Sequence, residues 1–173
     1  MSEVRSLHKG EFLELKRDRH WEFVRRVKAN GAVVIVAITE AGELVLVEQT
    51  RIPLQGKTIE LPAGITGDSD AVAGECFISA AHRELLEETG YTATSAEVIL
   101  QGPTAPGLTS EQLTFVRMRG LQQQHAGGGV DGEDITVHRV PLAAVHGWLT
   151  TKRVEGYFIE PRIYTGLWFA LNT

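Results

Sequence analysis

Cysteine is almost absent from this chain of 173 residues, which carries only Cys76. A single cysteine excludes an internal disulfide framework and is typical of a reducing compartment. The N-terminal segment "MSEVRSLHKGEFLELKRDRHWEF" is charged throughout and lacks an apolar core, so no secretory signal is predicted. The longest apolar run, "AVVIVAI" at 32–38, is too short to cross a bilayer. We therefore expect a cytoplasmic globular protein with no membrane partner.

The chain also has no excess of basic over acidic residues. The formal charge of −5 at pH 7 argues against sequence-independent binding of nucleic acid, so we expect no nucleic-acid partner. The six histidines show no metal-ligand spacing such as HxxxH, and no G-x-x-x-x-G-K-[ST] motif occurs. The length and the 43% of apolar residues fit a single domain over 1–173 with a buried core.

Strands and helices are mixed along the chain rather than strictly alternating. The predicted strands are 11–15, 20–27, 32–38, 44–51, 56–64, 96–102, 112–121 and 134–142, and the predicted helices are 73–89, 142–151 and 161–172. The Gly-rich polar segment 122–134 is predicted to be a mobile loop. This order indicates an α/β (α+β) fold, in which helices pack on the faces of a mixed sheet.

The stretch "AAHRELLEETGY", 80–91, concentrates carboxylates on one helix face. Residues three and four apart share a face, so Glu84 lies beside both Glu87 and Glu88. Such like-charge pairs cost only about 0.2–0.5 kcal/mol in water, so a solvated acidic surface remains an open interpretation. The alternative is a divalent metal site, because the preceding "ELPAG" loop can bring the carbonyl oxygen of Ala63 close to the glutamates. Carboxylate and carbonyl oxygens suit Mg²⁺ or Mn²⁺, which assist the cleavage of phosphate anhydrides.

A longer pattern surrounds these glutamates and resembles the box of the Nudix hydrolase family, G-x5-E-x7-R-E-U-x-E-E-x-G-U, where U is apolar or aromatic. The matching residues are Glu75, Arg83, Glu84, Leu85, Glu87, Glu88, Gly90 and Tyr91. The chain departs from the pattern at Ser69, where a glycine is expected. Gly64 is the nearest equivalent, so the loop 65–74 carries an insertion within the region 64–91.

The resemblance implies a fold, a cofactor and roles for these residues. It implies an α/β/α sandwich that binds Mg²⁺, for which Mn²⁺ can substitute. Glu84 and Glu88 would be metal ligands, and Glu87 a ligand or a carboxylate that orients water. The carbonyl of Ala63 would complete the coordination, and Arg83 would pair with a neighbouring glutamate and hold it in place.

Further segments resemble the ADP-ribose and nucleoside-diphosphate-sugar pyrophosphatase branch of this family: "HWEFVRR", "VEQTRIP", "IELPAG", "APGLTSE" and "GEDITVHRVPL". Pro106 lies fifteen residues after Tyr91, a spacing that marks the ADP-ribose type. The resemblance implies hydrolysis of the pyrophosphate bond of ADP-ribose or a related nucleotide sugar, giving a nucleoside monophosphate and a sugar phosphate. A preference for GDP-mannose and a non-catalytic nucleotide sensor remain alternatives.

Substrate contacts outside the box follow from the same resemblance. In this branch the N-terminal strands, here 1–30, exchange between the subunits of a homodimer. Trp21 would stack on the base, although a core or interface aromatic is an open alternative. Arg26 and Arg51 match arginines that reach the phosphate or the terminal sugar; surface salt bridges are the alternative.

The loop "VDGEDI" resembles the segment that brings one more acid to the site in this branch, although solvated surface acids are an open alternative. Glu133 is the first choice as metal ligand or general base, before Asp131 and then Asp134. Glu111, after "PGLTS", would support the same metal cluster.

Overall fold

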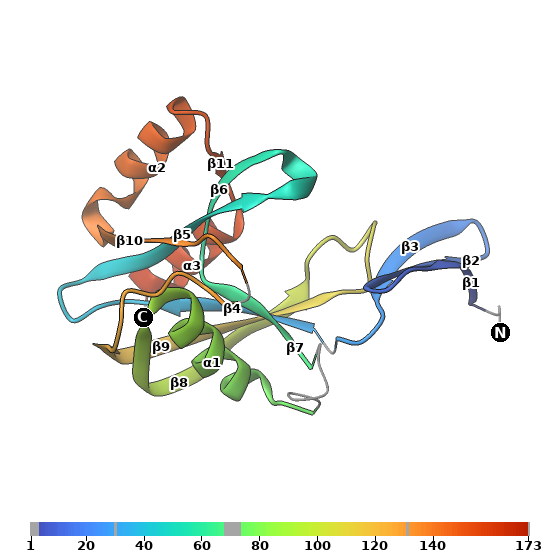
Figure 1. The fold of residues 1–173 in the computed structure, drawn as a ribbon, viewed down its shortest axis with the longest axis horizontal. Coiled ribbons are helices and arrows are strands. Elements are labelled where there is room, and N and C mark those ends of the chain that lie inside the picture. The colour runs from blue at the N-terminus through green and yellow to red at the C-terminus, as the bar shows by residue number, and fades with distance from the viewer. Residues whose placement is uncertain (1–3, 30, 68–73, 131, 173) are drawn as a thin grey trace.

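The protein is described by a computed structural model that covers residues 4–29, 31–67, 74–130 and 132–172. An N-terminal antiparallel sheet projects from the body of the molecule (Figure 1). Its strands are β1 (Arg5–Lys9), β2 (Leu13–Asp18) and β3 (Trp21–Arg26). The sequence predicted β2 and β3 but missed β1, because the polar "RSLHK" is exposed along its whole length and carries no burial pattern.

The central strand β4 (Gly31–Ala37) is buried at every position, as its apolar run predicted. Side chains alternate across a strand, so the run is divided between two faces. Val34 and Val36 belong to one hydrophobic cluster, whereas Val33 and Ile35 belong to the other. A strand packed on both faces needs apolar residues throughout, which explains the absence of alternation in its sequence.

Two four-stranded sheets form the body, rather than the single mixed sheet that was predicted. Their strand orders are β7-β4-β9-β8 and β10-β5-β6-β11. The pairs β4–β9 and β6–β11 are parallel and the others antiparallel, so both sheets are mixed. The remaining strands are β5 (Glu43–Arg51), β6 (Gly56–Glu60), β7 (Ala63–Thr66), β8 (Tyr91–Pro103), β9 (Gln112–Gln123), β10 (Thr136–Pro141) and β11 (Phe158–Ile159). The short β7 and β11 gave no periodic signal in the sequence.

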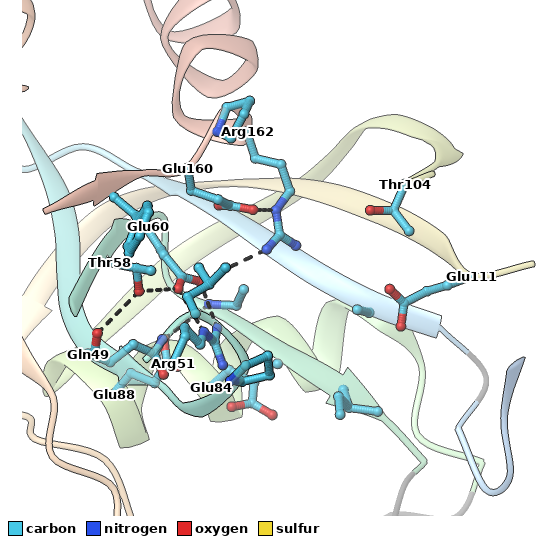
Figure 2. A pocket seen from close by; sticks show the side chains of 18 of the residues that line it. Gln49, Arg51, Thr58, Glu60, Glu84, Glu88, Thr104, Glu111, Glu160 and Arg162 are labelled. Atoms are coloured by element: carbon cyan, nitrogen blue, oxygen red, sulfur yellow. Dashed lines mark hydrogen bonds and ion pairs between the residues drawn. The ribbon is translucent and has the colours of Figure 1, made fainter. Parts of the chain in front are cut away.

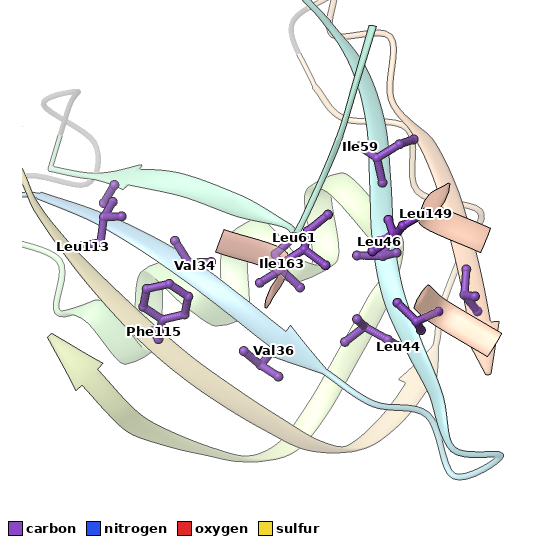
Figure 3. Close-up of a cluster of buried hydrophobic side chains, with 13 residues drawn as sticks. Val34, Val36, Leu44, Leu46, Ile59, Leu61, Leu113, Phe115, Leu149 and Ile163 are labelled. Atoms are coloured by element: carbon purple, nitrogen blue, oxygen red, sulfur yellow. The ribbon is translucent and has the colours of Figure 1, made fainter. Parts of the chain in front are cut away.

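Helices cover both sides of these sheets, as expected for an α/β/α sandwich (Figures 1 and 3). Helix α1 (Phe77–Thr89) packs Ala81 and Leu85 into one cluster. Helices α2 (Val145–Val154) and α3 (Arg162–Leu171) contribute to the other cluster. Helix α1 begins later than the predicted residue 73. Residues 68–73 of the predicted insertion 65–74 lie outside the described residues. No helix in the described ranges is both long enough and apolar enough to traverse a bilayer.

The Gly-rich segment after β9 is hydrogen-bonded to the C-terminal end of α1. The prediction of a mobile loop did not anticipate this contact. The N–H of Gly128 donates to the carbonyl of Glu88 at 3.0 Å, and that of Gly129 donates to the carbonyl of Glu87 at 3.1 Å. The last carbonyls of a helix have no hydrogen-bond donor within the helix. The N–H groups of this segment donate to those carbonyls. A Cβ at Gly127 would lie 2.5 Å from the Glu88 carbonyl oxygen, so glycine is required for the close approach.

Candidate active site

A cavity of about 680 Å³ brings together residues from both sheets, α1, the Gly-rich segment and the start of α3 (Figure 2). The predicted site residues that line it are Arg26, Arg51, Ala63, Glu84, Glu88, Glu111 and Glu133. The predicted residues outside its lining are Trp21, Arg83, Glu87, Pro106 and Asp134. Asp131 lies outside the described residues.

Glu88 is the most deeply buried acid of the helix, with 4% of its surface exposed. Its Oε2 accepts a hydrogen bond from the N–H of Ala63 at 3.0 Å. Burial nevertheless raises the pKa of Glu88 to about 8, and the nearby Glu84 and Glu133 contribute to the increase. The "LPAG" loop therefore contacts the helix acids, as the sequence suggested, and its backbone N–H gives a contact that the sequence did not reveal.

Glu84 lies directly against the backbone of Gly64. A Cβ at residue 64 would overlap the Glu84 carboxyl, so only glycine leaves room for it. Burial raises the pKa of Glu84 to about 7; Arg83 opposes the increase, and Glu87 and Glu133 add to it. The part-buried Glu84 and the buried Glu88, on adjacent turns, therefore both have pKa values above that of free glutamate.

Arg83 organises the acids behind the cavity. Its Nη1 donates to Glu84 Oε1 at 2.7 Å and to Glu87 Oε2 at 3.1 Å. Its Nη2 donates to Glu75 Oε2 at 3.0 Å and to the carbonyl of Ile65 at 3.4 Å. These acids raise the pKa of Arg83, and the hydrogen bond that Arg83 donates to Glu75 is the largest cause. The planar guanidinium thus holds three carboxylates, more than the one that was predicted.

The donor set fits a hard divalent cation. Glu84 and Glu88 both line the cavity, and burial together with neighbouring carboxylates raises both pKa values. Carboxylate oxygens are the ligands that such a cation prefers. In the described ranges, no group of three Asp, Glu, His or Cys side chains is gathered closely enough to hold an ion. Glu133 Oε2 instead accepts the N–H of Val130 at 3.1 Å.

Both predicted arginines line the cavity and are also engaged in ion pairs. Arg51 Nε and Nη2 donate to the two carboxylate oxygens of Glu60, each at 2.7 Å. Glu60 is almost fully buried, with 2% exposed. Arg26 pairs with Glu111, which also lines the cavity. The salt bridges kept open as the alternative are therefore present, and they hold both arginines at the cavity wall.

Trp21 and Pro106 do not reach the cavity within one chain. Trp21 lies on the projecting sheet, where half of its surface is exposed, and it lines a separate hollow with His20 and Phe23. Pro106 is exposed in the turn between β8 and β9. A role for either residue in substrate binding therefore needs a second subunit or a movement of the loop.

Several lining residues were missed by the sequence analysis: Thr58, Glu60, Phe158, Glu160 and Arg162. Glu60 is the buried last residue of strand β6, between Ile59 and Leu61. A charged residue between two apolar ones was a signal that could have predicted a role for Glu60. The "FIEPR" segment gave no signal, because its position beside the cavity depends on the pairing of β11 with β6.

Comparison with known proteins agrees with this architecture. Residues 28–156 match the NUDIX domain family. A solved structure of an "ADP compounds hydrolase" superposes with a TM-score of 0.73 over 96% of this chain and 88% of that chain, at 22% sequence identity. At this sequence identity, the structural similarity shows a common fold and nothing further.

Curated relatives cover most of the chain. An ADP-ribose pyrophosphatase of Mycobacterium tuberculosis is 36% identical over 91% of this chain and 84% of its own length. A methanol dehydrogenase activator of Bacillus methanolicus is 35% identical over 80% of this chain and 68% of its own length. A GDP-mannose pyrophosphatase of Pectobacterium atrosepticum is 28% identical over 95% of this chain and 89% of its own length.

Proposed function

Because this chain belongs to the NUDIX family, we propose that it is a pyrophosphatase that hydrolyses the diphosphate bridge of ADP-ribose or a related nucleoside diphosphate sugar. Water attacks one phosphorus, and the products are a nucleoside monophosphate and a sugar phosphate. For ADP-ribose these are AMP and ribose 5-phosphate. The observation that carries the proposal is the part-buried carboxyl of Glu84 beside the buried carboxyl of Glu88, both lining a cavity that arginines also line.

The proposed cofactor is Mg²⁺, for which Mn²⁺ can substitute. Glu84, Glu88 and the carbonyl of Ala63 would hold it, with Glu87 and Glu133 as further carboxylates. A bound divalent cation neutralises the diphosphate and activates water. Without a cation, the substrate would face buried acids of its own charge, and a like-charge pair at 4 Å costs about 4 kcal/mol at an effective dielectric near 20.

The chain's own residues supply positioning and proton transfer in this proposal. Arg83 fixes the carboxylates of Glu84 and Glu87. Glu133 is exposed on the Gly-rich segment and takes the proton of the attacking water at its carboxylate. Arg51 and Arg26 line the cavity and orient the phosphate oxygens, for which the guanidinium fork is suited.

We further propose a cytoplasmic homodimer in which the N-terminal strands pack on the partner. The projecting sheet exposes Phe12, Leu13 and Trp21, and an exposed apolar surface of this kind favours association. Trp21 of one subunit would then stack on the base held by the other. The single cysteine fits the reducing cytoplasm.

The test is phosphate release coupled to a phosphatase, first with Mg²⁺ and then with EDTA. The substrates are ADP-ribose, GDP-mannose, NADH and diadenosine polyphosphates. We expect turnover of ADP-ribose that EDTA abolishes. A stronger turnover of GDP-mannose would support the alternative that the Pectobacterium relative suggests. Binding without turnover under every metal condition would instead indicate a nucleotide sensor.

A further inference from the structure

One end of the cavity is built by the short segment from Phe158 to Arg162, which joins β11 to α3. In Figure 2, Glu160 and Arg162 lie at the opposite end of the drawn residues from Glu84 and Glu88. Phe158 is half exposed and lines the same cavity. Neither the carboxylate site nor the proposed reaction steps above use this segment.

Glu160 carries a buried hydrogen-bond acceptor that has no partner among the described residues. Its Oε1 is paired with Arg162, whereas its Oε2 is shielded from solvent and accepts no hydrogen bond. The backbone is fixed at this point, because the N–H of Glu160 donates to the carbonyl of Ile59 at 3.0 Å. Buried polar atoms are nearly always satisfied, so an orphan oxygen at a cavity wall indicates a donor that arrives with a ligand.

Arg162 offers donors beside that acceptor. Its Nη2 is 3.9 Å from Glu60 Oε2, too far for a hydrogen bond. Glu60 is already occupied, since it accepts both Nε and Nη2 of Arg51 and, at 2.5 Å, the hydroxyl of Thr58. Burial lowers the pKa of Arg162, Glu60 opposes this change, and Arg51 adds to it. The guanidinium is therefore only partly compensated, and it still offers N–H groups to a ligand.

We propose that Glu160 and Arg162 form the subsite for the sugar of the nucleotide sugar. A sugar hydroxyl donates to Glu160 Oε2, a neighbouring sugar oxygen accepts from Arg162, and Phe158 packs on the apolar face of the ring. Adjacent hydroxyls are each both donor and acceptor, which matches an orphan acceptor beside a free donor. The inference rests on the proposed function, which places the diphosphate at Glu84 and Glu88 and the base at Trp21.

The first test compares substrates that differ in one half only. The ratio of kcat/KM for ADP-ribose to ADP-glucose reports the sugar, and the ratio for ADP-ribose to IDP-ribose reports the base. In Glu160→Ala we expect kcat/KM for ADP-ribose to fall about 10- to 100-fold, the loss expected for a hydrogen bond to a charged group. The sugar ratio should move toward one, and the base ratio should stay unchanged.

A matched control is Glu155→Ala. Glu155 also pairs with a cation, Lys152 at 2.9 Å, but it is exposed on the surface and does not line the cavity. Both ratios should match the wild type in this variant. An unchanged sugar ratio in Glu160→Ala would overturn the proposal, and so would a change in the base ratio alone. Should Glu160→Ala fail to fold by circular dichroism, Glu160→Gln, which keeps the size of the side chain, takes its place.

A binding measurement separates this inference from the proposed function. The probes are ribose 5-phosphate and methyl phosphate, which share a phosphate monoester and differ in the sugar hydroxyls. Calorimetry should show that wild-type protein prefers ribose 5-phosphate and that Glu160→Ala loses the preference. If no substrate is hydrolysed but the preference persists, the proposed function fails and the subsite stands. Hydrolysis by a wild type without the preference would overturn the subsite alone.

Discussion

The carboxyl of Glu84 occupies the space that a side chain at Gly64 would need. Glu84, two helical turns into α1, can take this position only because residue 64 of strand β7 is a glycine. This contact favours Gly64 as the counterpart of the glycine that the Nudix pattern places nearer to the helix.

Substituting Gly64→Ala tests that relationship. The new methyl group should displace Glu84 from the cavity and lower kcat by about 10-fold or more, because small misplacements of catalytic groups are costly. Gly147→Ala is the matched control: Gly147 lies in α2 with nothing within 4 Å of an added Cβ. It should keep wild-type kcat and stabilise the protein by about 0.5–1 kcal/mol. Equal kcat in the two variants would contradict the assignment of Glu84.

Glu88→Gln separates the charge of Glu88 from its packing. The amide oxygen of glutamine can still accept the N–H of Ala63, so the fold should persist, whereas the negative charge that a metal needs is lost. We expect kcat to fall about 10²-fold or more, with a circular dichroism spectrum like that of the wild type. Steady-state kinetics over a Mg²⁺ titration provides the measurement. Wild-type activity in this variant would exclude Glu88 as a ligand.

The parts of the fold that the sequence predicted are those with a local signal. The buried run of β4 and the stripe of Ala81 and Leu85 on α1 depend only on period and composition, and both were confirmed. The acids of the helix were found for the same reason, since spacing within a helix fixes which of them share a face.

What was missed depends on contacts between distant segments. Glu160 and Arg162 reach the cavity because the two-residue strand β11 pairs with β6, a contact that no local pattern encodes. The Gly-rich segment looked mobile by composition, yet its backbone N–H groups bond to the carbonyls at the end of α1. Arg51 was predicted from the resemblance to the family branch, but its bidentate pairing with Glu60 required the register of β5 against β6.

Arg83→Lys tests whether one planar cation must hold several acids. A lysine ammonium is a compact charge and cannot reproduce the fork that joins Glu75, Glu84 and Glu87. We expect kcat to fall by about 10-fold or more, with KM affected less, because the freed carboxylates lose their orientation. Glu75→Gln, which weakens the same clamp from outside the cavity, should show a smaller effect in the same direction. A rise in KM alone would indicate that Arg83 binds substrate instead.

The stability of the metal-free protein should depend on pH through Glu84 and Glu88. Their pKa values are raised from 4.5 to about 7 and about 8. Between pH 4.5 and about 8, the folded protein retains protons that the unfolded chain has released, so the free energy of unfolding falls as pH rises through this window. The stabilisation that these two groups give the folded protein is fully present below pH 4.5 and is lost above their folded pKa values.

Mg²⁺ should reverse that loss, because it binds the deprotonated carboxylates. The increase in Tm on adding Mg²⁺ in place of EDTA should be larger near pH 8.5 than near pH 5.5 by differential scanning fluorimetry. In Glu88→Gln, the increase in Tm on adding Mg²⁺ should differ less between pH 8.5 and pH 5.5 than it does in the wild type. An increase in Tm that is the same at both would show that the cation binds elsewhere.

Trp21 lies outside the cavity of its own chain, so the dimer hypothesis makes a strict prediction for it. Trp21→Ala should raise KM while kcat and the dimeric mass by analytical ultracentrifugation stay the same. If Trp21 serves the partner's cavity, mixing unfolded Trp21→Ala and Glu88→Gln chains and refolding them should restore activity at a substrate concentration far below the raised KM, where each parent alone has little activity. Each mixed dimer would contain one site with both residues intact, so an equal mixture should reach about a quarter of wild-type activity. A mixture no more active than its two parents would show that Trp21 acts within its own chain or only in the interface.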